Sequence, residues 1–252
     1  MIQRYGFFAY FSDRPDAGYG FGMYSVTHFV VLAVIAVIIA AMCIGYKRMD
    51  DASRLKMVRI IAYTLVVIEI MQVSSYPIFH DGFRVEYFSL HLCGIMIFVG
   101  LAYAIKPSET VGEILYAVGL PGYLAAFAFP NWTMYPLLNF YAIKAFTTHG
   151  LQIAFILMLI FAGQVRPSPS RAWKPLVFLV AIAIPIYILN LAIGTNFLYI
   201  NSGSPGSPLE IFIDTFGSPL FLVPYAGLVV VVIALMYMPW YIIEKKKGRA
   251  KY

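Results

Sequence analysis

The sequence predicts an all-α polytopic membrane protein with seven transmembrane helices, its N-terminus outside the cytoplasm and its C-terminus inside. Composition, the spacing of apolar stretches and the distribution of basic residues lead to this fold class. Of the 252 residues, 61% are hydrophobic and only 12% are charged. Because a soluble domain carries about 25% charged residues, this chain has too little polar surface to face water. Its solvent must be largely lipid.

Seven apolar stretches of about 19 or more residues are each long enough to cross a bilayer core of roughly 30 Å as a helix. They cover residues 24–45, 59–80, 87–105, 112–130, 141–163, 175–194 and 220–241. The fourth stretch contains Gly119, Pro121 and Gly122. A proline inside a membrane helix leaves one carbonyl without its usual partner, so we expect a kink there, at a packed position.

Basic residues concentrate in the connections after spans one, three and five and in the C-terminal tail, which predicts that these regions face the cytoplasm. Of the 18 Lys and Arg residues, 14 lie there: Lys47, Arg48, Arg54, Lys56, Arg59, Lys106, Arg166, Arg171, Lys174, Lys245, Lys246, Lys247, Arg249 and Lys251. The opposite side holds only Arg4, Arg14, Arg84 and Lys144. The predicted regions are an extramembrane N-terminal segment (1–23), the seven-helix domain (24–241) and a basic cytoplasmic tail (242–252).

A net charge of +6 would suit a nucleic-acid partner in a soluble protein. Here the basic run at 244–249 follows the last span directly, which favours an anchor on anionic lipid instead. We therefore expect no nucleic-acid partner and a multi-pass location in a cell membrane. Arg4, Asp13 and Pro15 interrupt any signal-peptide core, so the first 23 residues are expected to stay on the mature protein as a short extramembrane lid.

The longest outer connection, 195–219, contains no Lys or Arg. Glycines and prolines surround a short apolar and acidic piece at 209–216. A loop this long and this apolar is typical of a re-entrant or interfacial lid. A disordered loop would have the same composition, and the sequence leaves both interpretations open.

One span carries a polar stripe. Glu69 lies near the middle of the second span, and Gln72 and Tyr76 follow it on the same helical face, towards His80. A charge at the bilayer centre costs roughly 2.5–3.5 kcal/mol on insertion scales, so each such residue needs a reason. The stripe is either a polar seam that binds neighbouring helices or part of a functional site.

All four histidines are expected in the outer half of the membrane: His28, His80, His91 and His149. Asn190 and Asn196 lie at the same depth, at the outer end of the sixth span. A single histidine of this kind is usually an interfacial residue with satisfied hydrogen bonds. Four at one depth favour a polar cavity that opens to the outer leaflet.

Cys93 is expected at that depth too, roughly 9 Å below the outer boundary at 1.5 Å per residue. Cys43 lies at the other end of its span, so a disulfide between the two is excluded. Buried cysteine is usually an apolar filler, and a nucleophilic thiol would need a base. His91 is two residues away and points to another side of the helix. We therefore expect His149, from a different helix, as the base, with Glu69 or Asn190 to orient its ring.

Two segments resemble a known family. Residues 90–94, Leu-His-Leu-Cys-Gly, and 194–200, Gly-Thr-Asn-Phe-Leu-Tyr-Ile, are similar to signature segments of the YwaF-like bacterial integral membrane proteins. That family is similar to the eukaryotic transmembrane protein 164, a cysteine-dependent lipid acyltransferase. The resemblance implies Cys93 as the nucleophile and His149 as its partner, and it adds Tyr199 to the residues expected to support the site or bind substrate.

The favoured hypothesis is a lipid acyltransferase or acyl hydrolase that forms a Cys acyl-enzyme on the outer-leaflet side. Its partner would be a membrane phospholipid or lysolipid, with His91, Asn190 or Asn196 donating to the oxyanion. The alternative is a transporter or small-molecule binder with Glu69, Gln72 and the histidines along its path. A zinc hydrolase or a retinal pigment is disfavoured, since the last span has no histidine and no lysine. We expect no metal and no cofactor; the sequence does not reveal the oligomeric state.

Overall fold

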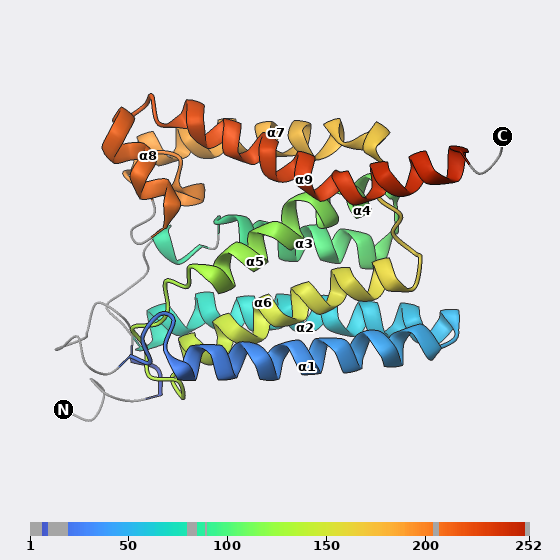
Figure 1. The fold of residues 1–252 in the computed structure, drawn as a ribbon. Coiled ribbons are helices and arrows are strands. Elements are labelled where there is room, and N and C mark those ends of the chain that lie inside the picture. Colours follow the sequence, from blue (N-terminus) through green and yellow to red (C-terminus); the bar gives the residue numbers. More distant parts are fainter. Residues whose placement is uncertain (1–6, 10–19, 80–84, 89, 204–206, 250–252) are drawn as a thin grey trace.

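The computed structural model describes residues 7–9, 20–79, 85–88, 90–203 and 207–249, and every regular element in these ranges is helical (Figure 1). The long helices are α1 (Val26–Arg48), α2 (Asp51–Phe79), α6 (Phe140–Phe161), α7 (Trp173–Ile193) and α9 (Leu222–Arg249). Between α2 and α6 lie α3 (Leu92–Ile105) and one continuous rod made of α4 (Glu109–Ile114), η4 (Leu115–Gly119) and α5 (Leu120–Ala128). The connections hold η3 (Val85–Tyr87), η5 (Pro169–Arg171), η6 (Phe197–Tyr199) and α8 (Pro208–Phe216).

Six helices of the described chain are long and apolar enough to cross a membrane, with the α4–η4–α5 rod counted as one. The sequence predicts seven, and the difference lies in the third stretch. Its helix α3 has only 14 residues, because the backbone is still extended at His91, directly before the helix begins. At 1.5 Å per residue α3 is about 21 Å long, shorter than a bilayer core. The all-helical fold is confirmed, with six helices long and apolar enough to cross a membrane and one shorter apolar helix.

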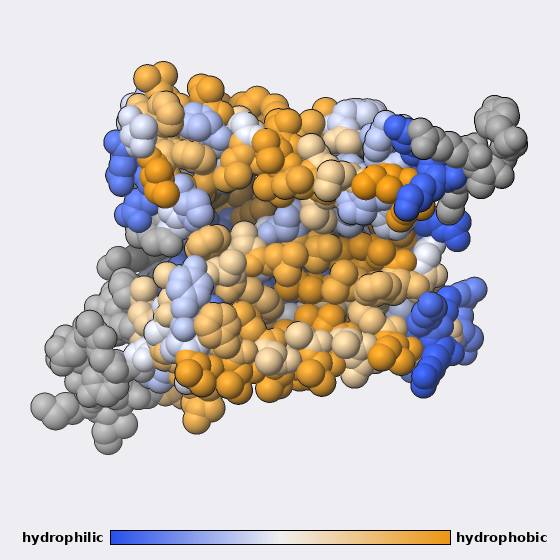
Figure 2. All heavy atoms as spheres, viewed as in Figure 1, coloured by the Kyte–Doolittle hydropathy of each residue, from blue (hydrophilic) through white to orange (hydrophobic). Residues whose placement is uncertain are grey.

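The helices run side by side, with α6 and the α4–η4–α5 rod at the centre (Figure 1). In the most apolar part of these two elements, 61% of the residues are buried within the protein, against 11% in α1, α7 and α9. The last three therefore present most of their side chains outward. Figure 2 shows the result, a broad hydrophobic surface along the length of the helices with hydrophilic residues at their ends. Such a surface suits contact with lipid rather than water.

The expected irregularity in the fourth stretch takes the form of a π-helical segment. η4 spans Leu115–Gly119 and ends two residues before Pro121. Proline has no backbone N–H, so it cannot donate a helical hydrogen bond. A side chain on Gly119 would lie 3.0 Å from a Met96 atom and 3.2 Å from an Ile156 atom, so α3 and α6 approach the rod closely here. The packed position predicted from the sequence is confirmed.

The two ends of the bundle differ in character. α1 begins at the end where α8 lies, and α9 finishes at the opposite end (Figure 1). At the α8 end, Phe8 of the N-terminal segment stacks on Phe79 of α2 with 4.2 Å between ring centroids. The connection at 195–219 contains two short helices, η6 and α8, and no residue of α8 is buried. The described part of this loop is thus helical in two places, while its role as a lid stays a prediction.

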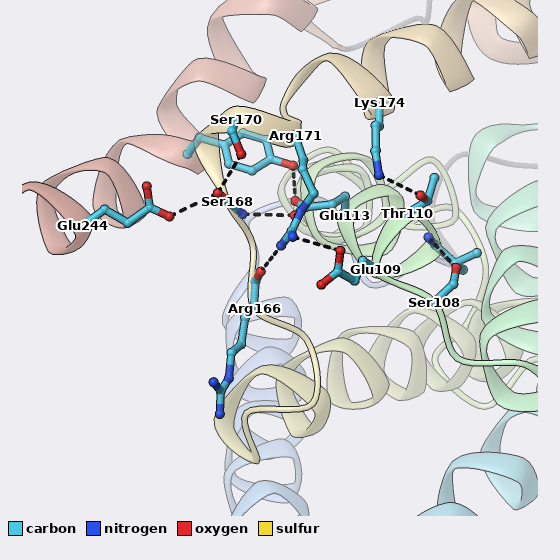
Figure 3. Close-up of polar contacts among 12 residues, drawn as sticks. Ser108, Glu109, Thr110, Glu113, Arg166, Ser168, Ser170, Arg171, Lys174 and Glu244 are labelled. Atoms are coloured by element: carbon cyan, nitrogen blue, oxygen red, sulfur yellow. Dashed lines mark hydrogen bonds and ion pairs between the residues drawn. The ribbon is translucent and has the colours of Figure 1, made fainter.

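The other end is held by a network around Glu113 of α4 (Figure 3). Glu113 is only 1% exposed, and one of its oxygens accepts hydrogen bonds from Arg171 Nε at 2.6 Å and from the Ser168 backbone N–H at 3.0 Å. The other oxygen accepts from the hydroxyl of Tyr237 on α9. Arg171 also pairs with Glu109 at 3.0 Å. One buried carboxylate thereby connects α4, η5 and α9.

Replacing Arg171 by methionine is expected to lower the thermal stability of the purified protein clearly. The change leaves the Glu113 carboxylate buried without its cation, and breaking a buried pair in this way costs about 3 kcal/mol or more. For a chain of this size the melting temperature should fall by on the order of 10 °C. The matched control is Arg166→Met, because the Arg166 side chain is exposed and, among the described residues, bonds only the nearby Gly163 carbonyl. Equal melting temperatures for the two variants would contradict the assigned role of Arg171.

Candidate active site

Cys93 is the second residue of α3 and is partly exposed, and its side chain packs against the central core. His91, the residue before the helix, turns to a different side. Its ring lies 4.8 Å from that of Tyr199 and 5.5 Å from that of Phe197, measured between centroids, so it faces η6. The sequence-based expectation that His91 is a poor base for Cys93 agrees with this placement.

His149 lies on α6 inside an aromatic cluster formed by Tyr123, Phe127 and Trp132. Its ring stacks on Trp132 with 5.1 Å between centroids and an angle of 19°. The centroids of the Tyr123 and Phe127 rings lie 6.1 Å and 5.9 Å from that of the His149 ring. Tyr123 and Phe127 come from α5 and Trp132 from the loop that leads into α6, so the cluster positions the imidazole from three sides.

The His149 ring is oriented by its own helix. Its Nδ1 lies 2.7 Å from the carbonyl oxygen of Ala145, one turn earlier. A carbonyl can only accept, so Nδ1 carries the proton and Nε2 is left as the basic nitrogen of the neutral ring. The expectation that Glu69 or Asn190 orients this imidazole through Nδ1 is therefore wrong, because the backbone already occupies that position.

Cys93 and His149 lie on helices that pack together. The start of α3 approaches α5 closely, because a side chain on Gly122, next to Tyr123, would lie 3.1 Å from Leu92, the residue before Cys93. Tyr123 itself is in edge contact with the His149 ring. The structure thus places the start of α3 against α5 and α6, the helices that carry the Tyr123–His149 contact.

An ion pair connects α6 with α2. Lys144 Nζ of α6 is 2.9 Å from Glu69 Oε2 of α2, and the two side chains are 13% and 6% exposed. The other Glu69 oxygen, Oε1, is buried and has no hydrogen-bond partner among the described residues. Sequence reasoning singled out Glu69 but assigned Lys144 to the outer surface. Lys144 lies inside a predicted span, and this position indicates that its charge needs a buried partner.

Asn190 and Asn196 are placed elsewhere: Asn190 lies near the end of α7, and Asn196 lies in the loop that follows. Asn190 donates to the Phe197 carbonyl at 2.9 Å and to Asn201 Oδ1 at 2.7 Å, and it accepts from Thr195 and from the Phe197 N–H. Asn196 donates to the Ser202 carbonyl and accepts two backbone N–H groups. Because the amide of Asn190 has no free donor, the expectation that it stabilises an oxyanion is wrong. Both asparagines brace the loop.

The remaining predicted residues do not converge on one cavity. Gln72 donates to the hydroxyl of Tyr76 on its own helix. His28 is buried near the rings of Phe21 and Phe146, and His80 lies outside the described residues. Tyr199 packs on His91 and accepts from Asn131 at 3.2 Å. The sequence-based expectation of four histidines around one cavity is therefore not met by the three described ones.

A small cavity lies one helical turn further along α3 and α6 from Cys93 and His149. It offers about 10 Å³ to the centre of a water molecule, room for about one water. Met96, Tyr123 and Gln152 line it, together with six other residues: Ala62, Leu65, Gly100, Leu115, Phe155 and Ile156. Both polar atoms of the Gln152 amide are buried without a hydrogen-bond partner in the described structure. Sequence reasoning missed Gln152 as well as Tyr123 and Trp132.

Comparison with known proteins gives one match. The model of the TMEM164 family matches residues 23–242. No curated protein and no solved structure matches the chain.

Proposed function

Because this chain belongs to the TMEM164 family, we propose that it is a membrane-embedded lipid acyltransferase or acyl hydrolase that forms an acyl-enzyme at Cys93. The observation that carries the proposal is the packing of α3, with Cys93 near its start, against α5 and α6, whose residues surround and orient the His149 ring. The Ala145 carbonyl accepts from Nδ1 of that ring, which leaves Nε2 as its basic nitrogen. A nucleophile with a nearby, well-oriented base is the arrangement that acyl transfer requires.

The proposed topology has seven crossings, with α3 as the short third one, the N-terminus outside and the C-terminus inside. The turn between α1 and α2, the start of α7 and the end of α9 all lie at one end of the bundle (Figure 1). That end carries the basic residues on which the orientation rests, including Lys47, Arg48 and Arg54. The YwaF-like sequence segments support a bacterial plasma membrane as the location.

Cysteine labelling tests this orientation. In a background without native cysteines (Cys43→Ala, Cys93→Ala), Thr215→Cys on α8 should react with a membrane-impermeant maleimide added to intact cells. Ala52→Cys, in the first turn of α2, should react only after the membrane is permeabilised. Both positions are exposed, so accessibility within the protein does not limit the reaction. The reverse labelling pattern would contradict the proposed orientation.

In the first proposed step, His149 Nε2 takes the proton from Cys93, and the thiolate attacks the carbonyl carbon of a lipid ester. The new C–S bond gives a tetrahedral oxyanion, which collapses with cleavage of the ester C–O bond. The departing lysolipid alkoxide takes the proton back from His149. The acyl group is then held as a thioester.

In the second step, the hydroxyl of an acceptor lysolipid, or water in a hydrolase, gives its proton to His149 Nε2 and attacks the thioester carbonyl. The C–S bond breaks, and the Cys93 sulfur recovers the proton from His149. A buried N–H for the oxyanion is available at Trp132: its Nε1 has no partner in the described structure, and its ring stacks on His149. We prefer this donor to Asn190, whose N–H groups are occupied.

The proposal is tested with purified protein in liposomes that contain an acyl-labelled phospholipid and an unlabelled lysophospholipid. The label should move to the lysolipid in a transferase, or appear as free fatty acid in a hydrolase. The control is the same liposome preparation with the Cys93→Ala variant. The proposal fails if the wild-type protein moves no more label than this control does.

The Glu69–Lys144 pair favours a second candidate function, a transporter, because titratable residues within a membrane domain often mark an ion path. Uptake of a solute into proteoliposomes that is lost in Glu69→Ala and kept in Cys93→Ala would support this function. The same assay with both variants therefore separates the two candidates.

A further inference from the structure

Gln152 of α6 carries a polar group that is buried among the helices without a protein partner. The residue is only 4% exposed, and neither its amide oxygen nor its amide nitrogen has a hydrogen-bond partner in the described structure. A buried donor or acceptor that stays unpaired costs the full desolvation of that group. Most such groups in native proteins therefore bind either another protein atom or an ordered water.

The small cavity of about 10 Å³ lies directly beside this side chain, because Gln152 forms part of its lining. Of the described residues that line the cavity, only Gln152 and Tyr123 have an oxygen or nitrogen atom in the side chain. A cavity of this size holds one water, and a buried water needs about two to four polar partners. The amide offers an acceptor and two donors, and the tyrosine adds a hydroxyl.

Other occupants do not match the cavity. A metal ion such as Ca²⁺ takes about six to eight oxygen ligands, and the described lining contains no carboxylate. The end of a lipid tail would leave both polar atoms of Gln152 unpaired, at the cost described above. A single water matches both the size of the cavity and the hydrogen bonds that the amide lacks.

We propose that this cavity binds one water molecule, which bridges the Gln152 amide on α6 and the Tyr123 hydroxyl on α5. The water lies where residues of α2, α3 and η4 also meet these two helices. Since the Tyr123 ring is in edge contact with His149, the water also restrains a ring that packs on the candidate base. The inference goes beyond the proposed function and does not depend on it, because these hydrogen bonds form whether or not the protein transfers acyl groups.

Melting temperatures of purified variants test the site through Gly100 of α3, which also lines the cavity. A Cβ atom there would meet one atom within 4 Å, Phe155 Cε1 at 4.0 Å, so an alanine methyl group has room and takes up part of the cavity. Gly100→Ala should expel the water and leave Gln152 unpaired. The melting temperature should then fall by about 2 °C or more, although alanine is the better helix former.

The same substitution is expected to have the opposite effect in a Gln152→Leu background. Leucine has no polar atom that needs the water, so the methyl group of Gly100→Ala fills apolar space and should raise the melting temperature by about 2 °C or more. Gln152→Leu alone should melt at or below the temperature of the wild type. The inference is overturned if Gly100→Ala stabilises both backgrounds, or if Gln152→Leu alone melts several degrees higher, because a dry cavity would behave in these ways.

A direct measurement on the wild-type protein makes the test independent of how the variants fold. In solid-state NMR spectra of the protein in lipid bilayers, magnetisation should pass from water to the side-chain amide protons of Gln152. The matched control is Asn190, which is 1% exposed and whose amide already donates to the Phe197 carbonyl and to Asn201 Oδ1. Transfer at Gln152 that is no greater than at Asn190 would overturn the inference.

Discussion

Replacement of Cys93 by alanine is expected to abolish acyl transfer, with a loss of about 10⁴-fold or more in the rate. Alanine has no atom that can form the thioester, so neither half of the reaction can proceed through the covalent route. The loss should appear as a fall in kcat, because the thiol is needed for bond formation more than for lipid binding. The measurement is the initial rate of label transfer in liposomes at saturating phospholipid.

The matched control is Cys43→Ala. Cys43 is buried on α1 near the basic end of the bundle, far along the chain from the candidate site, and it should keep transfer within about twofold of the wild type. Both variants remove one sulfur atom from a packed position, so their melting temperatures should be similar. Transfer that survives in Cys93→Ala and is lost in Cys43→Ala would reverse the assignment.

The second large effect is expected for His149→Gln, which should slow formation of the acyl-enzyme by about 10²–10⁴-fold. Glutamine approximates the size of histidine, and its amide N–H can still donate to the Ala145 carbonyl that now accepts from Nδ1. It cannot take a proton from Cys93. The loss should therefore lie in the chemical step, and single-turnover measurement of acyl-adduct formation reports that step directly.

His28→Gln is the control for this substitution. His28 is also a buried histidine, on α1, and its Nδ1 accepts from the Tyr24 backbone N–H rather than facing Cys93. The variant should acylate at close to the wild-type rate. An unchanged rate in His149→Gln would mean that another group accepts the proton, and the assignment of His149 as base would be withdrawn.

The fold was largely readable from the sequence because lipid imposes a simple rule: an apolar stretch of sufficient length becomes a helix. The rule also located the irregularity before Pro121, since proline has a fixed local effect. The rule was wrong at the start of α3. The helix begins only at Leu92, after apolar residues that the rule places within the span, and His91 turns towards η6. That turn depends on packing against a loop about 100 residues away in the sequence. A hydropathy profile carries no information about such a contact.

The site was only partly predictable. The helical positions of His91 and Cys93 exclude His91 as a base, because the two side chains point to different sides of α3. The Ala145 carbonyl lies one turn before His149 on α6, so the spacing of these two residues also indicates the contact with the ring. The pairing of Lys144 with Glu69 depends on which helices pack together, so no local pattern reveals it. Asn190 illustrates a further limit: its residue type suggests a donor, and only the structure shows that its donors are taken.

The identity of the residue that carries the acyl group tests the proposed mechanism most directly. Purified wild-type protein is incubated with an acyl-labelled phospholipid, and the modified peptide is identified by mass spectrometry with and without hydroxylamine, which cleaves thioesters. We expect the acyl mass on the peptide that contains Cys93, its loss on hydroxylamine treatment, and its near absence in His149→Gln. An acyl group on any other residue, or no adduct under conditions where label is transferred between lipids, would contradict the proposed mechanism.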